Sequence, residues 1–221
     1  MQLIDIPTEQ TTAATDLVIA LLAIVAANFL RRTGPSGLRG RLWRSVFLLL
    51  AVAAFLGAIG HGLVLGERVY LLVWSAVYLP LALLVTMFLA ATIHDLAGDT
   101  AARRAIPPLV VIALAFCGYM LFDPGNFLPF ILFELVAMTL SLAGFLWISV
   151  RGAVAGAGWI TAAIAVNILA AAIQAEGSLG FTLVWAFDHN GVFHLVQMIA
   201  IGLLVYGLRL EVQGEGSGLP G

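Results

Sequence analysis

The chain has 221 residues, of which 62% are hydrophobic and only 10% are charged. Soluble domains average about 45–50% apolar and about 25% charged residues, so this composition excludes an ordinary water-soluble domain. The formal net charge is −2, and no basic face remains outside the apolar segments, which argues against a nucleic-acid-binding protein. The composition predicts an integral membrane protein whose main partner is the lipid bilayer.

Seven apolar runs follow one another along the chain. Most reach the length of about 17–25 residues that a helix needs to cross about 30 Å of hydrocarbon, and lipid offers no hydrogen-bond partners to an open sheet edge. We therefore expect an all-α, seven-transmembrane helix bundle over residues 1–210, followed by a flexible Gly-rich tail at 211–221. The runs are Leu17–Leu30 (extendable back to Thr11), Ser45–Leu65, Val69–Ile93, Ile106–Phe122, Phe127–Val150, Ala153–Ile173 and Gly191–Leu208.

The basic residues, all of them arginine, predict how the bundle is oriented. Nine of the ten lie on one side of the predicted spans, and only Arg68 lies on the other side. The positive-inside rule then places the amino terminus outside the cell and the carboxyl terminus in the cytoplasm. An alanine-rich chain without lysine is typical of a GC-rich bacterial genome, which favours the bacterial inner membrane.

Ionisable side chains gather near the outer ends of the predicted spans. His61 lies close to the end of the second span, while His189 and His194 lie at the mouth of the last span and just inside it. Glu134 falls about two turns into the fifth span, where an ionisable group is costly. Imidazole and carboxylate together suit Zn²⁺. The alternative is a hydrogen-bonded polar cluster that orders the bundle without a metal.

Two further segments near this side have simpler interpretations. Asp16 lies within one turn of the start of the first apolar run and follows Thr15. We interpret it as a helix N-cap that satisfies open backbone N–H groups. The longest outer connection, Glu176–Asp188, contains the apolar stretch Phe181–Phe187. This stretch is expected to form either an extra turn of the last helix or an interfacial lid.

Two short motifs carry a resemblance to a known group. The second span ends in Gly57-Ala-Ile-Gly-His61, and the last span begins Asp188-His189-Asn190-Gly-Val-Phe-His194. In layout and motif placement the chain resembles the CREST superfamily of seven-span membrane proteins, which includes the alkaline ceramidases and the progestin and adiponectin receptors. That family has Ser-xxx-His on span two and His-xxx-His on span seven. Gly57 therefore stands at the serine position and Asn190 at the first histidine position.

The resemblance implies a zinc site and a hydrolytic activity. His61, His189 and His194 are the expected metal ligands, although the third ligand could equally be Asn190, Glu134 or Asp16. With zinc bound, Glu134 would serve as the general base in hydrolysis of a lipid amide or ester that enters from the outer leaflet. The resemblance thus implies the family fold together with a zinc-dependent hydrolytic activity.

Other function classes compete with the hydrolase. A retinal-binding protein needs a lysine for its Schiff base, and the chain contains none. A haem-binding electron carrier could use His61 and His194 as axial ligands. A non-catalytic receptor, binding protein or assembly factor could keep the same fold with a metal or polar cluster, and the loss of the family serine and of one histidine favours that alternative. A transporter is disfavoured because no paired broken spans are found.

Overall fold

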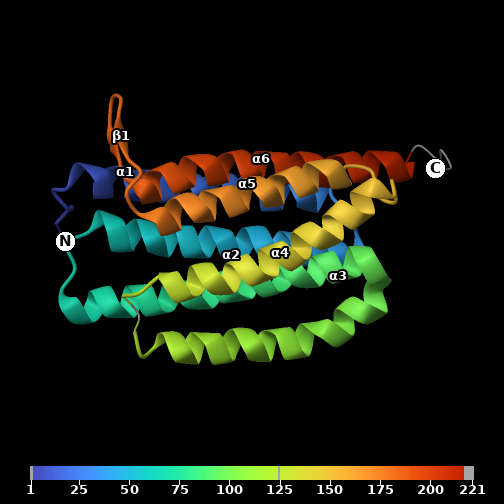
Figure 1. Cartoon of the computed structure of the whole chain (residues 1–221), viewed down its shortest axis with the longest axis horizontal. Coiled ribbons are helices and arrows are strands. Elements are labelled where there is room, and N and C mark those ends of the chain that lie inside the picture. The colour runs from blue at the N-terminus through green and yellow to red at the C-terminus, as the bar shows by residue number, and fades with distance from the viewer. Residues whose placement is uncertain (1, 124, 217–221) are drawn as a thin grey trace.

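Long helices run side by side along the long axis of the molecule, and the two termini lie at opposite ends (Figure 1). The computed structural model describes residues 2–123 and 125–216. The helices and strands, in chain order, are α1 (Pro7–Thr33), α2 (Gly37–Gly62), α3 (Glu67–Met120), α4 (Leu128–Val150), α5 (Ala157–Glu176), β1 (Phe181–Thr182), β2 (Ala186–Phe187) and α6 (His189–Gly216). The expected all-α character is confirmed, apart from one short hairpin.

Helix α3 consists of two arms that meet at Gly98. This glycine has a φ of 83° and is the non-helical residue between them. Glycine populates positive φ without steric cost, so the chain reverses there and the second arm runs back beside the first (Figure 1). The third and fourth apolar runs thus belong to the two arms, and a bend at one residue takes the place of the expected connecting loop.

The first residues of α1 and α5 differ from the starts of the apolar runs for identifiable reasons. Helix α1 begins at Pro7, because proline is favoured in the first turn and needs no hydrogen bond for its nitrogen. Asp16 therefore lies inside the helix, and its interpretation as an N-cap is wrong. Helix α5 begins at Ala157 instead of Ala153, because Gly152 and Gly156 both have positive φ and keep this segment out of the helix.

The connection between α5 and α6 is a two-stranded antiparallel hairpin in which Phe181 pairs with Phe187. The alternative of an extra turn of the last helix is therefore wrong. At its other end α6 continues to Gly216, into the segment predicted as a flexible tail. The remainder of that predicted tail, residues 217–221, lies outside the described residues.

The surface and the interior of the bundle are both apolar. Within the described residues, six helices are long and apolar enough to cross a membrane. Large apolar side chains such as Val25, Leu72 and Val111 are exposed on their outer faces, which suits contact with lipid tails. Inside, Trp43 is fully buried at the centre of the main hydrophobic core.

Candidate functional site

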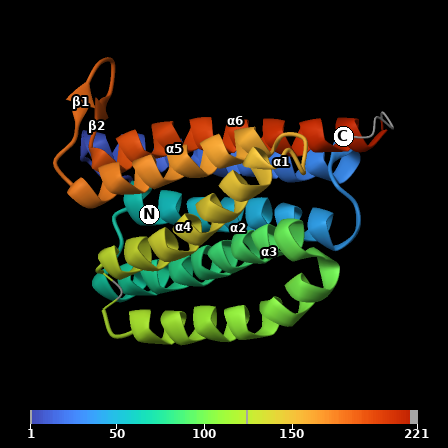
Figure 2. The same ribbon diagram turned by 45° about the vertical axis from the view of Figure 1, so that its right-hand side comes forward.

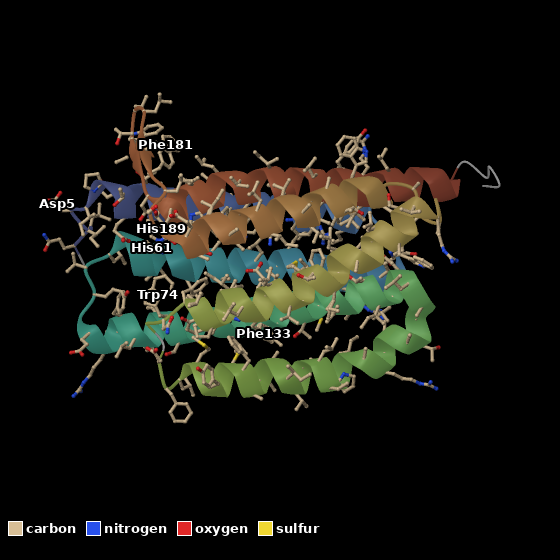
Figure 3. The ribbon with its side chains drawn as sticks, viewed as in Figure 1. Asp5, His61, Trp74, Phe133, Phe181 and His189 are labelled. Atoms are coloured by element: carbon tan, nitrogen blue, oxygen red, sulfur yellow. The ribbon has the colours of Figure 1, made fainter. Side chains whose placement is uncertain are left out.

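A cavity of about 540 Å³ lies among the helices at the end of the bundle that carries the hairpin. Its walls come from α1, α2, the first arm of α3, α4, α5 and α6. Figure 3 shows two of its histidines, His61 and His189, at this end. The His, Asp and Glu residues that line it are Glu9, Asp16, His61, Glu134, His189 and His194. The cavity thus brings together the four residues that the sequence singles out as catalytic or metal-binding.

His194 is buried and oriented by α1. Its Nδ1 lies 2.8 Å from the hydroxyl of Thr15. That hydroxyl also lies 3.0 Å from the carbonyl oxygen of Thr11 and 2.9 Å from that of Thr12, and a hydroxyl has one hydrogen to donate. When the hydroxyl donates to either carbonyl, it accepts from the Nδ1–H of His194. In the neutral ring, the lone pair is then on Nε2.

Asp16 faces this lone pair. Its Oδ1 lies 3.4 Å from Nε2 of His194, and its Oδ2 is buried without a hydrogen-bond partner. The residue as a whole is 5% exposed. Buried carboxylate oxygens normally have partners, and two acceptors at this distance do not stabilise each other. The contact between Oδ1 and Nε2 is favourable only when a proton or a cation lies between these two atoms.

The missing side chain at Gly57 provides the space for Asp16. A Cβ at position 57 would lie 2.8 Å from Oδ2 of Asp16 and 3.1 Å from both its Cγ and its Oδ1. The carboxylate from α1 therefore packs directly over the backbone of α2 at Gly57. A side chain at this position would displace Asp16.

His61 is oriented in a similar way from the same helix. Its Nδ1 lies 2.7 Å from Oε2 of Glu9, and its ring packs edge-to-face with Trp74 at a centroid distance of 5.0 Å. A carboxylate accepts hydrogen bonds, so Nδ1 carries the proton and Nε2 of the neutral ring keeps its lone pair. A histidine whose other nitrogen is held by a carboxylate or another oxygen acceptor is the usual arrangement in protein metal sites.

Glu134 is a buried residue of the cavity wall. Its Oε1 accepts a hydrogen bond of 2.9 Å from Nδ2 of Asn167 on α5. It lines both the large cavity and a narrower apolar pocket of about 70 Å³. Glu134 therefore lies where the large cavity and the apolar pocket meet, whereas Glu9 and Asp16 are the cavity carboxylates that contact histidines.

The start of α6 places the remaining candidates. His189 is the first residue of the helix and lines the cavity. Its neighbour Asn190, which also lines the cavity, accepts a hydrogen bond of 3.2 Å from Gln174 through Oδ1. This bond ties the beginning of α6 to the end of α5, so Asn190 has a positioning contact.

The donor atoms suit zinc in kind but are not gathered into a complete centre. In the part of the chain that the structure describes, no group of three or more His, Cys, Asp and Glu side chains is placed to hold a metal ion. The chemistry of the set nevertheless fits zinc. Nε2 of His61 and Nε2 of His194 are imidazole donors once Nδ1 carries the proton, and Oδ2 of Asp16, which is buried without a hydrogen-bond partner, is a carboxylate donor. Asp16 contacts His194, whereas His189 is the first residue of α6.

Sequence reasoning did not assign Glu9 or Thr15 to the site, because Glu9 precedes the first apolar run and Thr15 lies in the extension of that run back to Thr11. One signal could have found them. Pro7 followed by Glu9 is typical of the first turn of a helix, and a helix that begins at Pro7 places Glu9 and Asp16, seven residues apart, on one face. What the sequence does not contain is the rotation of α1 that turns this face toward the histidines.

The chain matches a family described as a family of unknown function, DUF6962, over residues 11–212. This match covers nearly the whole helical bundle. The chain belongs to the DUF6962 family. No curated protein and no solved structure matches the chain. The DUF6962 match includes Asp16, His61, Glu134 and His194, so these cavity residues lie within the family region, and Glu9 lies just before it.

Proposed function

We propose that this protein crosses a bacterial inner membrane seven times, with the two arms of α3 as separate spans. The apolar helices and the arginine asymmetry support this arrangement. The amino terminus and the cavity would then face outward. Reporter fusions at Gly37 and Gly214 should report the cytoplasm, and one at Asn126 should report the outside. A cytoplasmic signal at Asn126 would contradict the proposed orientation.

We further propose that the protein is a zinc-dependent membrane hydrolase of a lipid amide or ester. One observation carries this proposal. His61 and His194 each have Nδ1 within hydrogen-bond distance of an oxygen of α1, and both line one cavity with Asp16, whose Oδ2 is buried without a hydrogen-bond partner. A bundle that needed only hydrogen-bonded polar residues would be expected to give this oxygen a partner as well. The CREST-like placement of the two histidines agrees with this proposal.

The residues of the chain would divide the chemistry among them. His61, His194 and Asp16 would hold the zinc, which would supply a Lewis acid for hydrolysis of a carbonyl group. Glu9 and Thr15 keep the two imidazoles in the tautomer that leaves Nε2 free. Glu134, oriented through its Oε1 by Asn167, would accept the proton of the attacking water. The apolar lining around these groups would exclude bulk water and hold the substrate.

The deciding experiment measures metal content and turnover of the detergent-purified protein. We expect one zinc per chain in the wild type, and loss of that zinc in His61→Ala and in His194→Ala. His94→Ala is the matched control, because His94 lies on α3 beside the Gly98 bend, where it contacts Asp95 and Asp99. Zinc content well below one per chain after incubation with zinc would contradict both the metal and the hydrolase.

A second candidate function is a non-catalytic binding protein or receptor for a lipid. The observation in its favour is that Gly57 and Asn190 replace the serine and one histidine of the CREST motifs. This candidate predicts a protein that holds zinc, or a polar ligand, without turning over any lipid amide or ester. Metal content together with turnover on lipid amides and esters therefore separates the two candidates.

A further inference from the structure

The tip of the β1–β2 hairpin is an exposed apolar surface. Leu183 is 83% exposed, Val184 is 77% exposed and Trp185 is 68% exposed. No charged residue occurs in the whole stretch 177–187. Three consecutive exposed apolar residues on a loop that faced water would be unusual, because exposed apolar patches mark interaction sites.

The direction of the hairpin narrows down what it contacts. Figures 1 and 2 show the hairpin extending away from the bundle and across the helix axes, beside the end of α5 and the beginning of α6. In a membrane crossed by these helices, an arm with this direction runs along the membrane surface and does not rise into water. Tryptophan is enriched at this level, where headgroups meet the hydrocarbon. Bilayer lipid is thus the partner that suits both the composition and the direction.

The hairpin is built to keep this direction. The rings of Phe181 and Phe187 stack at a centroid distance of 4.9 Å across the strands. Gly180 packs so close that a Cβ there would lie 2.8 Å from the carbonyl oxygen of Phe187. Below the strands, Asp188 accepts hydrogen bonds from the hydroxyl of Thr12 and from the backbone nitrogen of Gly191. The base of the hairpin is therefore fastened to both α1 and α6.

We propose that the tip residues Leu183, Val184 and Trp185 insert into the interfacial layer of the outer leaflet and anchor the cavity end of the bundle to lipid. The inference rests on the proposed membrane-spanning arrangement but not on zinc or hydrolysis. Because β2 leads through Asp188 directly into His189, which lines the cavity, the anchor holds one edge of the cavity at the depth of the lipid headgroups. A lipid that enters the cavity would do so beside this anchor.

The test places a fluorophore at single cysteines in nanodiscs of phosphatidylcholine and phosphatidylglycerol. Cys117 is the only cysteine, so Cys117→Ser provides the background. Leu183→Cys and Val184→Cys are each labelled with the environment-sensitive dye NBD. Asp5→Cys, at an exposed position outside the helices, is the water control. Leu140→Cys, on the outer face of α4 where Leu140 is 56% exposed, is the deep-lipid control.

We expect labels at 183 and 184 to be quenched more by lipids with a shallow doxyl group than by lipids with a deep one. Their quenching by aqueous iodide should be severalfold weaker than at position 5. The label at 140 should be quenched most by the deep doxyl group, and failure of that control would count against the membrane-spanning arrangement itself. Iodide quenching at 183 and 184 equal to that at position 5 would overturn the anchor. Protection from both quenchers would also overturn it, since another protein surface would then cover the tip.

Discussion

Replacing Gly57 by alanine should disturb the candidate site and lower the stability of the bundle together. The new Cβ would lie 2.8 Å from Oδ2 of Asp16, whereas ordinary contacts begin at 3.4 Å. The carboxylate would have to retreat by roughly 0.6 Å, although Asp16 is buried and His194 lies on its other side. Overpacking of this kind costs about 1–3 kcal/mol, so we expect a loss of that size in the free energy of unfolding.

The effect is measured by unfolding of the purified protein in detergent, followed by tryptophan fluorescence. Gly202→Ala is the matched control, because Gly202 lies within α6 and a Cβ there would meet nothing within 4 Å. Alanine in an open helical position stabilises a helix by about 0.5–1 kcal/mol relative to glycine. Zinc affinity of Gly57→Ala should also fall, because a displaced carboxylate is a poorer ligand.

A double-mutant cycle tests the reasoning directly. In an Asp16→Ala background the carboxylate is gone, so the further change Gly57→Ala should cost little or nothing. The difference between the two backgrounds is the interaction energy between positions 16 and 57. An equal cost of Gly57→Ala in both backgrounds would refute the claim that Gly57 is needed to accommodate Asp16.

Three further predictions concern other contacts. Thr15→Val removes the acceptor for Nδ1 of His194 and should weaken zinc binding by about 10–100-fold. Competition with a chelator measures this affinity, and an unchanged affinity would contradict the orienting role of Thr15. Asn167→Ala leaves buried Glu134 without its amide donor and should lower the free energy of unfolding by about 1–3 kcal/mol, with little further loss in a Glu134→Leu background. Gly156→Ala should lower the midpoint of thermal unfolding more than Gly152→Ala. Both glycines have positive φ, but of the two only Gly156 would place a Cβ against backbone, at 2.2 Å from a carbonyl oxygen of α6. Equal midpoints would show that this close approach is unimportant.

The helices could be predicted because apolar runs of sufficient length have few alternatives in lipid. The ends of the helices could not, because they depend on single residues whose backbone conformation is a local matter. Pro7 starts α1 within a polar segment that hydropathy leaves out of the first apolar run. Gly156 delays the start of α5 because its positive φ accompanies a close approach to α6. At Gly98 the same conformation replaces a loop with a bend.

The candidate site, like the helices, has features that the sequence predicts and features that it does not. That His61, His194 and Glu134 line one cavity follows from their similar depth on separate spans, which the sequence contains. That Asp16 contacts His194 depends on the rotation of α1 about its own axis and on the empty space at Gly57. These are properties of three packed helices, and no spacing within one segment encodes them. Glu134 illustrates the converse, since its burial is visible in the sequence while its partner Asn167 is not.

The bend at Gly98 bears on how the chain is assembled during synthesis. With a single non-helical residue between them, the two arms of α3 have no slack in which one could settle in the membrane before the other. We therefore expect them to leave the insertion machinery as one hairpin. In the proposed orientation, His94 and Asp99, which are hydrogen-bonded to each other beside the bend, remain at the cytoplasmic surface throughout. Lengthening this turn would uncouple the arms and expose a half-inserted chain to proteolysis.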